Sequence, residues 1–267
     1  MSIVHEQNRR AWDATARRGR RFTQAATERE LAAPLKFLDA CGWLGPSVRG
    51  LRVLCLGAGG GRQSALFAAA GAIVSVVDIS GEMLALDEQV ARRHGLEVRT
   101  IKSSMDDLSR LEADEFDLVW QPVSTCYVPR VVRVYREVAR VLCAGGVYVS
   151  QHKQPASLQA DVAPSGGGYL LREPYYRDDP LPPVSGSLHR EHGTLEYLHR
   201  WEELVGGLCR AGFVIEDLVE PLHAEASAEN GSFADRSRYL PPYVRIKARR
   251  VGASRPAQVP VKTVWVP

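Results

Sequence analysis

Four glycines fall within five positions after an apolar run in the segment VLCLGAGGGR, residues 53–62. Glycine adopts positive φ without strain and lets a ligand approach the main chain closely. Where such a turn joins a strand to a helix, the helix start adds unpaired backbone N–H groups, and the combination is typical of a nucleotide site. The residues expected to contact the nucleotide are Gly57, Ala58, Gly59 and Gly61.

The spacing of the glycines discriminates between nucleotides. A dinucleotide fingerprint, G-x-G-x-x-G, requires glycine at position 62, which is Arg62 here. The pattern that fits is G-x-G-x-G. Asp78 ends the next apolar run about 20 residues further on, where an acidic side chain accepts hydrogen bonds from both ribose hydroxyls. These residues favour a ribose-containing ligand other than NAD, and a glycine turn without any ligand is the alternative.

Strands and helices alternate through the middle of the chain. The patterns predict strands at 51–57, 72–80, 96–101, 115–122, 145–152, 213–221 and 243–250. They predict helices at 3–21, 27–43, 62–70, 82–94, 131–142 and 199–212. We therefore expect an α/β protein with a doubly wound, mostly parallel seven-stranded sheet and helices on both faces.

Three segments lie outside this alternation. Residues 1–45 are expected to form an N-terminal helical lid on a Rossmann-like domain made of 46–152 and 200–250. Residues 153–199 are rich in Pro, Gly and Tyr and too long for an ordinary connection, so we expect an insertion that serves as a substrate lid. Residues 251–267 hold three prolines and are expected to be an extended C-terminal arm.

The composition is that of an ordinary globular protein. The 267 residues are 45% hydrophobic and 24% charged, with a formal net charge of +3, which allows a buried core and leaves little basic excess for nucleic acid. Five scattered cysteines form no CxxC pair, and no apolar run approaches the roughly 20 residues of a membrane span. We expect a soluble cytoplasmic protein that binds neither nucleic acid nor membrane.

Together these motifs resemble those of the class I S-adenosylmethionine-dependent methyltransferases. VLCLGAGGG is similar to the family's first motif, VVDIS to its second and FDLVWQPVS to its fourth. VYREVARVLCAGGVYVS and LCRAGFVIEDLVEP resemble later helix and strand pairs, and NRRAWDATA resembles the lid helix of many small-molecule members. Two positions depart from the family. Cys55 and Ser104 stand where it often has acids, before the first glycine and in the adenine loop.

The resemblance implies S-adenosylmethionine as the cofactor. Asp78 would hold the ribose, and Asp106 could bind the adenine amine in the absence of an acid at Ser104. Trp12 of the first helix would close over the cofactor, with ordinary packing as the alternative. The cofactor-binding residues implied are Gly57, Ala58, Gly59, Gly61, Asp78, Ile79, Met83, Ser104, Met105, Asp106, Gln121 and Trp12.

Methyl transfer is an in-line displacement at a sulfonium, so catalysis is largely alignment, with a base where the acceptor carries a proton. Gln121, at the end of the fourth strand, would lie over the sulfonium. His152 ends the fifth strand and is a candidate general base, because the ordinary pKa of histidine lies near neutrality. Tyr175 and Tyr176 in the insertion could wall the pocket. A structural role is the alternative for each, and no metal site is expected.

The expected function is methyl transfer from S-adenosylmethionine to a small-molecule acceptor. The main alternative makes the cofactor the only substrate: its own amine attacks its γ-carbon and gives azetidine-2-carboxylate and methylthioadenosine, with Tyr175 and Tyr176 around the aminobutyrate chain. A protein that binds the cofactor without catalysis is the third hypothesis. The identity of the acceptor and the oligomeric state do not follow from the sequence.

Overall fold

A seven-stranded sheet crosses the whole protein, a computed structural model of which describes residues 2–19, 22–184 and 189–252. Its strands are β1 (Arg52–Leu56), β2 (Ile73–Asp78), β3 (Val98–Lys102), β4 (Phe116–Gln121), β5 (Leu142–Lys153), β6 (Phe213–Val219) and β7 (Tyr243–Arg250). They are ordered β3-β2-β1-β4-β5-β7-β6. β1 to β5 are parallel, and β7 runs antiparallel between β5 and β6. The predicted mostly parallel seven-stranded sheet is confirmed.

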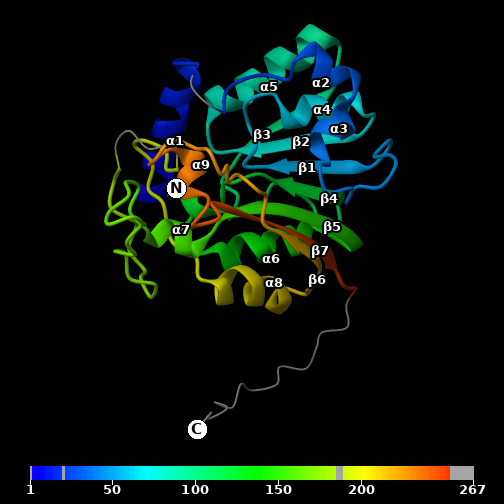
Figure 1. The fold of residues 1–267 in the computed structure, drawn as a ribbon. Coiled ribbons are helices and arrows are strands. Elements are labelled where there is room, and N and C mark those ends of the chain that lie inside the picture. Colours follow the sequence, from blue (N-terminus) through cyan, green and yellow to red (C-terminus); the bar gives the residue numbers. More distant parts are fainter. Residues whose placement is uncertain (1, 20–21, 185–188, 253–267) are drawn as a thin grey trace.

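Helices cover both faces of the sheet (Figure 1). One face carries α2 (Glu28–Ala32), α3 (Pro34–Leu38), α4 (Gln63–Ala69) and α5 (Gly81–His94), and the other carries α6 (Val131–Val141), the π-helical turn η2 (Glu202–Gly206) and α8 (Gly207–Arg210). Each face has its own apolar core, with Phe67 of α4 central to one and Tyr135 of α6 to the other. Burial on both faces explains the continuous apolar run of β1.

Several predicted boundaries differ from the structure. The helix predicted at 27–43 is divided into α2 and α3, because Pro34 forces the preceding Ala33 out of the helical region, to φ −143° and ψ 59°. The helix predicted at 3–21 ends earlier, since α1 spans Ile3–Arg17. Short helices α7 (Pro155–Gln159), η1 (Thr125–Tyr127) and α9 (Phe233–Arg236) occur in segments predicted to be irregular. All but two residues of the predicted arm 251–267 lie outside the described residues.

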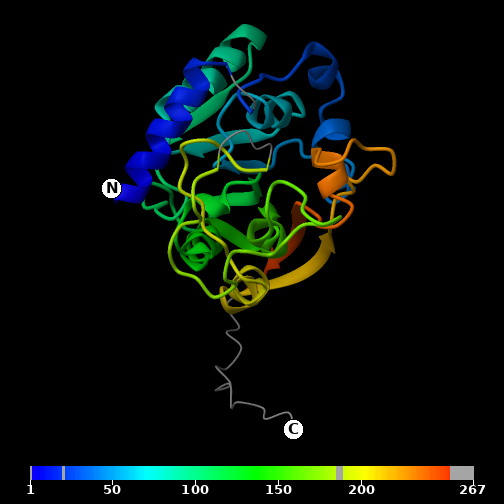
Figure 2. The ribbon, with the colours of Figure 1, turned by 60° about the vertical axis from the view of Figure 1, so that its left-hand side comes forward.

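Other parts of the chain cover the edge of the sheet at which the parallel strands have their carboxyl ends. The chain proceeds outward from β1 to β3 and then returns to place β4 on the other side of β1, which leaves a crevice where the strand order reverses. α1 and the segment 153–199 both lie across this edge, and they come to the front when the molecule is turned (Figure 2). Among the described residues, no helix combines the length and apolar character of a membrane span.

Candidate active site

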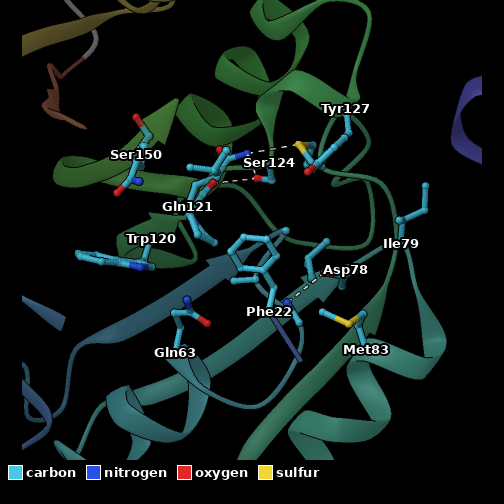
Figure 3. Close-up of a pocket in the computed structure, with 18 of the residues that line it drawn as sticks. Phe22, Gln63, Asp78, Ile79, Met83, Trp120, Gln121, Ser124, Tyr127 and Ser150 are labelled. Carbon is cyan, nitrogen blue, oxygen red and sulfur yellow. Dashed lines mark hydrogen bonds between the residues drawn. The ribbon is translucent and has the colours of Figure 1, made fainter. Parts of the chain in front are cut away.

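A pocket of about 500 Å³ opens at the crevice between β1 and β4 (Figure 3). The glycine turn after β1 forms its floor, and the loops after β2, β3 and β4 form its walls. Of the residues predicted to bind the cofactor, those that line this pocket are Trp12, Gly57, Ala58, Gly59, Asp78, Ile79, Met83, Ser104, Met105 and Gln121. The fold therefore brings together most of the candidate cofactor residues from five separate segments of the chain.

The glycine turn leaves no room for side chains. Gly57 has a φ of +57°, and a Cβ there would lie 2.8 Å from the Oγ of Ser124. A Cβ at Gly59 would lie 2.8 Å from the Cβ of Met83 and 2.9 Å from Oδ2 of Asp78. Real Cβ atoms do not approach neighbours so closely, so both positions require glycine.

Asp78 ends β2 directly beside this turn. Its Oδ2 accepts a hydrogen bond of 3.0 Å from the backbone N–H of Gly59, and its Oδ1 accepts one of 2.9 Å from that of Ser80. Burial raises the pKa of Asp78 to about 6, and the backbone donors offset only part of that effect. The carboxyl group is thus held in place at the pocket wall, and it is ionised at neutral pH.

Two predicted cofactor residues, Gly61 and Asp106, do not line the pocket. Gly61 packs against α5, where a Cβ would lie 2.8 Å from Val90, and its N–H donates to the buried carboxylate of Asp87. Asp106 accepts hydrogen bonds from the Oγ of Ser104 at 2.5 Å and lies 3.2 Å from Nε2 of His5. These residues support the walls of the pocket from behind.

Gln121 is held by a polar chain that begins in the core. Tyr148 donates to its Oε1, while its Nε2 donates to the Oγ of Ser124 at 3.0 Å and contacts the sulfur of Met105 at 3.3 Å (Figure 3). Gln121 is almost fully buried, and Tyr148 is completely buried. The side-chain amide of Gln121 is thus fixed in one orientation at the pocket wall.

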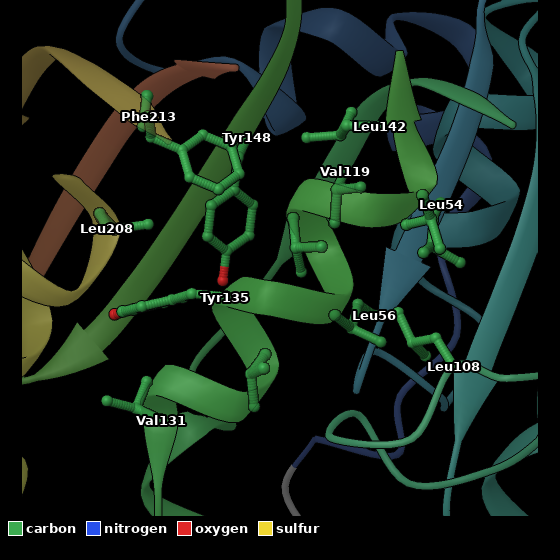
Figure 4. Packing of buried hydrophobic residues seen from close by; sticks show 14 of the residues in the cluster. Leu54, Leu56, Leu108, Val119, Val131, Tyr135, Leu142, Tyr148, Leu208 and Phe213 are labelled. Carbon is green, nitrogen blue, oxygen red and sulfur yellow. The ribbon is translucent and has the colours of Figure 1, made fainter. Parts of the chain in front are cut away.

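His152 lies outside the pocket, which is contrary to its predicted role as a base. Alternate residues of β5 face opposite sides of the sheet, so His152 shares its side with Tyr148. Tyr148 packs against Tyr135 of α6 in the core (Figure 4). The ring of His152 also packs against Tyr135, with centroids 6.2 Å apart, and does not line the pocket. Its Nδ1 is 2.8 Å from the Oγ1 of Thr125, and its Nε2 is 2.8 Å from the Oγ of Ser150. Burial lowers the pKa of His152 to about 3, so the ring is neutral and serves the packing.

The predicted tyrosine wall is also absent from the pocket. Tyr176 is 79% exposed and packs against the guanidinium of Arg200. The hydroxyl of Tyr175 accepts a hydrogen bond of 3.0 Å from the backbone N–H of Trp201, and its ring packs on a small apolar cluster formed by residues of the insertion itself. The pair stabilises the insertion, and neither ring reaches the cofactor end of the pocket.

The insertion instead contributes Glu191, which is not among the site residues predicted from the sequence. Its carboxylate lines the pocket and accepts hydrogen bonds from the hydroxyl of Tyr127 at 2.7 Å and from Nζ of Lys153 at 2.6 Å. Lys153 is buried and also pairs with Glu196 at 3.0 Å. The nearby ammonium lowers the pKa of Glu191, although burial opposes this effect. No spacing signal joins these residues, because they meet only in the folded chain.

Comparison of the sequence with known proteins identifies the family of this chain. Residues 54–150 match the profile of a methyltransferase domain. An uncharacterized methyltransferase of Bacillus subtilis (strain 168), YbaJ, is 32% identical over 235 residues, which are 82% of this chain and 91% of that protein. The chain belongs to the class I S-adenosylmethionine-dependent methyltransferases.

Solved structures agree with this assignment. A methyltransferase from Mesorhizobium loti, described as S-adenosylmethionine dependent, has a TM-score of 0.65 and 25% identity, and the match covers 82% of this chain and 100% of that chain. Geranyl diphosphate C-methyltransferase from Streptomyces coelicolor, solved with S-adenosyl-L-homocysteine, has the same fold at a TM-score of 0.65 and 16% identity. That match covers 94% of this chain and 99% of the other.

S-adenosylmethionine is accordingly the cofactor of this methyltransferase, and the pocket fits it. Because Gly59 has no side chain, its backbone lies directly against the carboxylate of Asp78 at the pocket wall, where that carboxylate can accept hydrogen bonds from ribose hydroxyls. Cys55, which stands where the family often has an acid, is fully buried behind the turn, and burial raises the pKa of its thiol. The carboxylates that line the pocket, among the described residues, are therefore Asp78 and Glu191. Within the same residues, no group of three or more His, Cys, Asp or Glu could hold a metal ion.

Proposed function

We propose that this methyltransferase acts on a small-molecule acceptor. The observation that supports the proposal is that the pocket continues past the glycine turn. Beyond the cofactor residues it is lined by a second set from other elements, which are Phe37, Leu38, Trp120, Val149, Gln151, Tyr243 and Arg245. A compact acceptor would occupy this second part, called here the acceptor half. A cytoplasmic location and the lack of a nucleic-acid substrate remain predictions from composition.

The cofactor supplies a methyl group on an electrophilic sulfonium, so the chain's contribution is alignment. The fixed amide of Gln121 lies at the junction of the two halves of the pocket. Trp12 and Tyr127 line the pocket as an edge-to-face pair with ring centroids 5.5 Å apart. Aromatic faces near a sulfonium add roughly 0.5–2 kcal/mol of attraction. These three residues would orient the reacting centre, in place of the predicted Tyr175 and Tyr176.

An acceptor with a proton on its nucleophile also needs a base, and we assign this role to Glu191. It is ionised, it lines the pocket, and its hydrogen bond to Tyr127 gives it a fixed position. His152 offers none of these features, because both of its nitrogens are satisfied within the core.

The alternative in which the cofactor is the only substrate depended on Tyr175 and Tyr176 around the aminobutyrate chain. Neither residue lines the pocket, so no observation favours that reaction over transfer to an acceptor. A protein that binds without catalysis is disfavoured as well, since the chain belongs to a family of methyltransferases.

The test is mass spectrometry of the nucleoside product after incubation with S-adenosylmethionine alone and with added small-molecule cell extract. We expect S-adenosylhomocysteine only when extract is present, and much less of it from Asp78→Asn at a cofactor concentration that just saturates the wild type. Methylthioadenosine formed without extract would contradict the proposal and establish the intramolecular reaction. Binding of the cofactor without any product in either incubation would establish the binding protein.

A further inference from the structure

Arg245 is a basic residue of the acceptor half, and its place in the sheet directs its side chain into the pocket. Arg245 lies on β7 between Val244 and Ile246, which point into the core beneath α6 and α8, so its side chain is on the opposite face and lines the pocket. Its register partner on β5 is Gln151, and Trp120 of β4 is the register partner of Val149, two residues before. Arg245, Gln151 and Trp120 therefore share one face of the sheet, and all three line the acceptor half.

The hydrogen bonds of Arg245 are to neutral groups. Its Nε donates to Oε1 of Gln151 at 2.7 Å, and Nη1 contacts the sulfur of Cys41 at 3.9 Å. Among the described residues no carboxylate lies within 4.0 Å of its guanidinium. By contrast, the other basic residues of β7 pair with acids: Lys247 and Arg249 with Glu216, and Arg250 with Asp114.

The second arginine that lines the pocket is also neutralised, because Arg62 pairs with Glu30 at 2.7 Å. In the part of the chain that the structure describes, Arg245 thus has no acidic partner, and its positive charge lies in the same wall as the apolar side chains of Phe37, Leu38 and Trp120. A guanidinium in such surroundings binds carboxylate or phosphate oxygens strongly, often through two parallel hydrogen bonds. Low local dielectric strengthens the attraction.

We propose that Arg245 selects an anionic acceptor, one whose carboxylate or phosphate binds the guanidinium while its apolar body lies against Trp120. β7 is two strands from β4, roughly 10 Å at the usual strand spacing, which is a span that a small aromatic or aliphatic acid can bridge. This inference rests on the proposed function, since it assigns a substrate class to the same pocket. It also explains why a basic side chain stands in a wall made mostly of apolar and aromatic residues.

The experiment is calorimetric titration of the protein, saturated with S-adenosylhomocysteine, with benzoate, phenyl phosphate and the neutral benzamide. We expect the better of the two anions to bind at least about tenfold more tightly than benzamide. The anion that wins distinguishes a carboxylate from a phosphate acceptor. Anions that bind no better than benzamide, or no binding by any of the three, would overturn the proposal.

Two variants separate this site from charge in general. Arg245→Gln should lose the preference for the anion and keep its affinity for benzamide. Arg249→Gln removes the same charge from the same strand, outside the pocket, and should keep the preference. An unchanged preference in Arg245→Gln would overturn the proposal. The affinity for S-adenosylhomocysteine is measured first. If S-adenosylhomocysteine does not bind, the proposed function is contradicted, and titration of the anions into the protein without it still tests the role of Arg245.

Discussion

Asp13 of α1 accepts a hydrogen bond of 2.5 Å from the Oγ of Ser80, two residues after the pocket carboxylate. The same serine caps α5, since its Oγ also accepts from the N–H of Met83 at 3.1 Å. One side chain therefore joins the start of α5, the loop beside Asp78 and the helix that crosses the pocket. α1 is also attached near its middle by Asn8, which forms hydrogen bonds with the backbone of Tyr127 and Leu195.

Asp13→Ala is expected to release α1 while leaving the α5 cap intact. Its matched control is Glu6→Ala, because both residues pair with Arg9 and only Asp13 reaches Ser80. We expect faster amide hydrogen exchange across residues 3–17 and a loss of S-adenosylhomocysteine affinity of about three- to tenfold, the typical net effect of one hydrogen bond. Equal exchange and affinity in the two variants would show that the contact with Ser80 has no role in closing the pocket.

Cofactor affinity should depend on pH through Asp78. Its pKa in the folded protein is raised to about 6, and ribose hydroxyls donate preferentially to the ionised carboxylate. The affinity for S-adenosylhomocysteine should therefore be constant above pH 7 and fall by up to about tenfold at pH 5, as the carboxyl takes up a proton. Calorimetric titrations across this range measure the effect.

Asp78→Asn is the variant that tests the assignment. Loss of two charge-assisted hydrogen bonds costs about 3 kcal/mol, so its affinity should be lower by on the order of 100-fold. It has no carboxyl to titrate, and the remaining affinity should not change between pH 5 and 7. Wild-type affinity that is independent of pH would place the ribose elsewhere.

Gly59→Ala should abolish cofactor binding. The added methyl would lie under 3 Å from both Met83 and Asp78, so it would displace the carboxylate that is expected to hold the ribose. Gly81→Ala is the control, because it adds the same methyl at the start of α5, where the nearest atom is the end of the Lys102 side chain at 3.5 Å. Thermal shift with S-adenosylhomocysteine should show no stabilisation of Gly59→Ala and the wild-type shift for Gly81→Ala.

The fold was predictable because the signals that encode it are local. Apolar strands that alternate with amphipathic helices leave few topologies other than a doubly wound sheet. The cofactor site at the glycine turn and Asp78 could be predicted for the same reason. Each of these features ends a strand, and the carboxyl ends of parallel strands meet at one edge of the sheet. The break at Pro34 was also encoded locally, although the apolar spacing on either side of it favoured one continuous helix.

The acceptor half was not predictable from local patterns. Its members come from elements that are distant in sequence, such as Phe37 before the sheet and Arg245 near its end, and only the tertiary fold joins them. His152 was predicted to be a site residue from its type and its place at the end of a strand, but its side chain faces the core and not the pocket. Register decides this, because one residue of displacement exchanges the two faces of a strand.

His152 gives a prediction about stability. Its pKa is near 6.5 in the unfolded chain and about 3 in the folded protein, so its neutral form stabilises the fold above pH 6.5, and that contribution is lost as the pH falls. The free energy of unfolding should fall less steeply between pH 6 and 4 in His152→Gln than in the wild type. The two slopes should differ by about 1.4 kcal/mol per pH unit, because the variant lacks the one proton that His152 takes up on unfolding. Urea unfolding followed by circular dichroism measures both slopes. A kcat inflection near pH 6.5 that the variant loses would restore His152 as the base.

Glu191 is the residue on which acceptor chemistry should depend. Glu191→Gln keeps the shape of the side chain and removes its charge, so kcat with an active extract fraction should fall at least tenfold, within the range of a lost general base, while S-adenosylhomocysteine affinity stays within about threefold of wild type. Glu196→Gln is the matched control: it removes the other carboxylate that pairs with Lys153, and it does not line the pocket. If the two variants lose kcat equally, the effect belongs to the buried lysine's charge balance, and Glu191 has no separate role in taking the acceptor's proton.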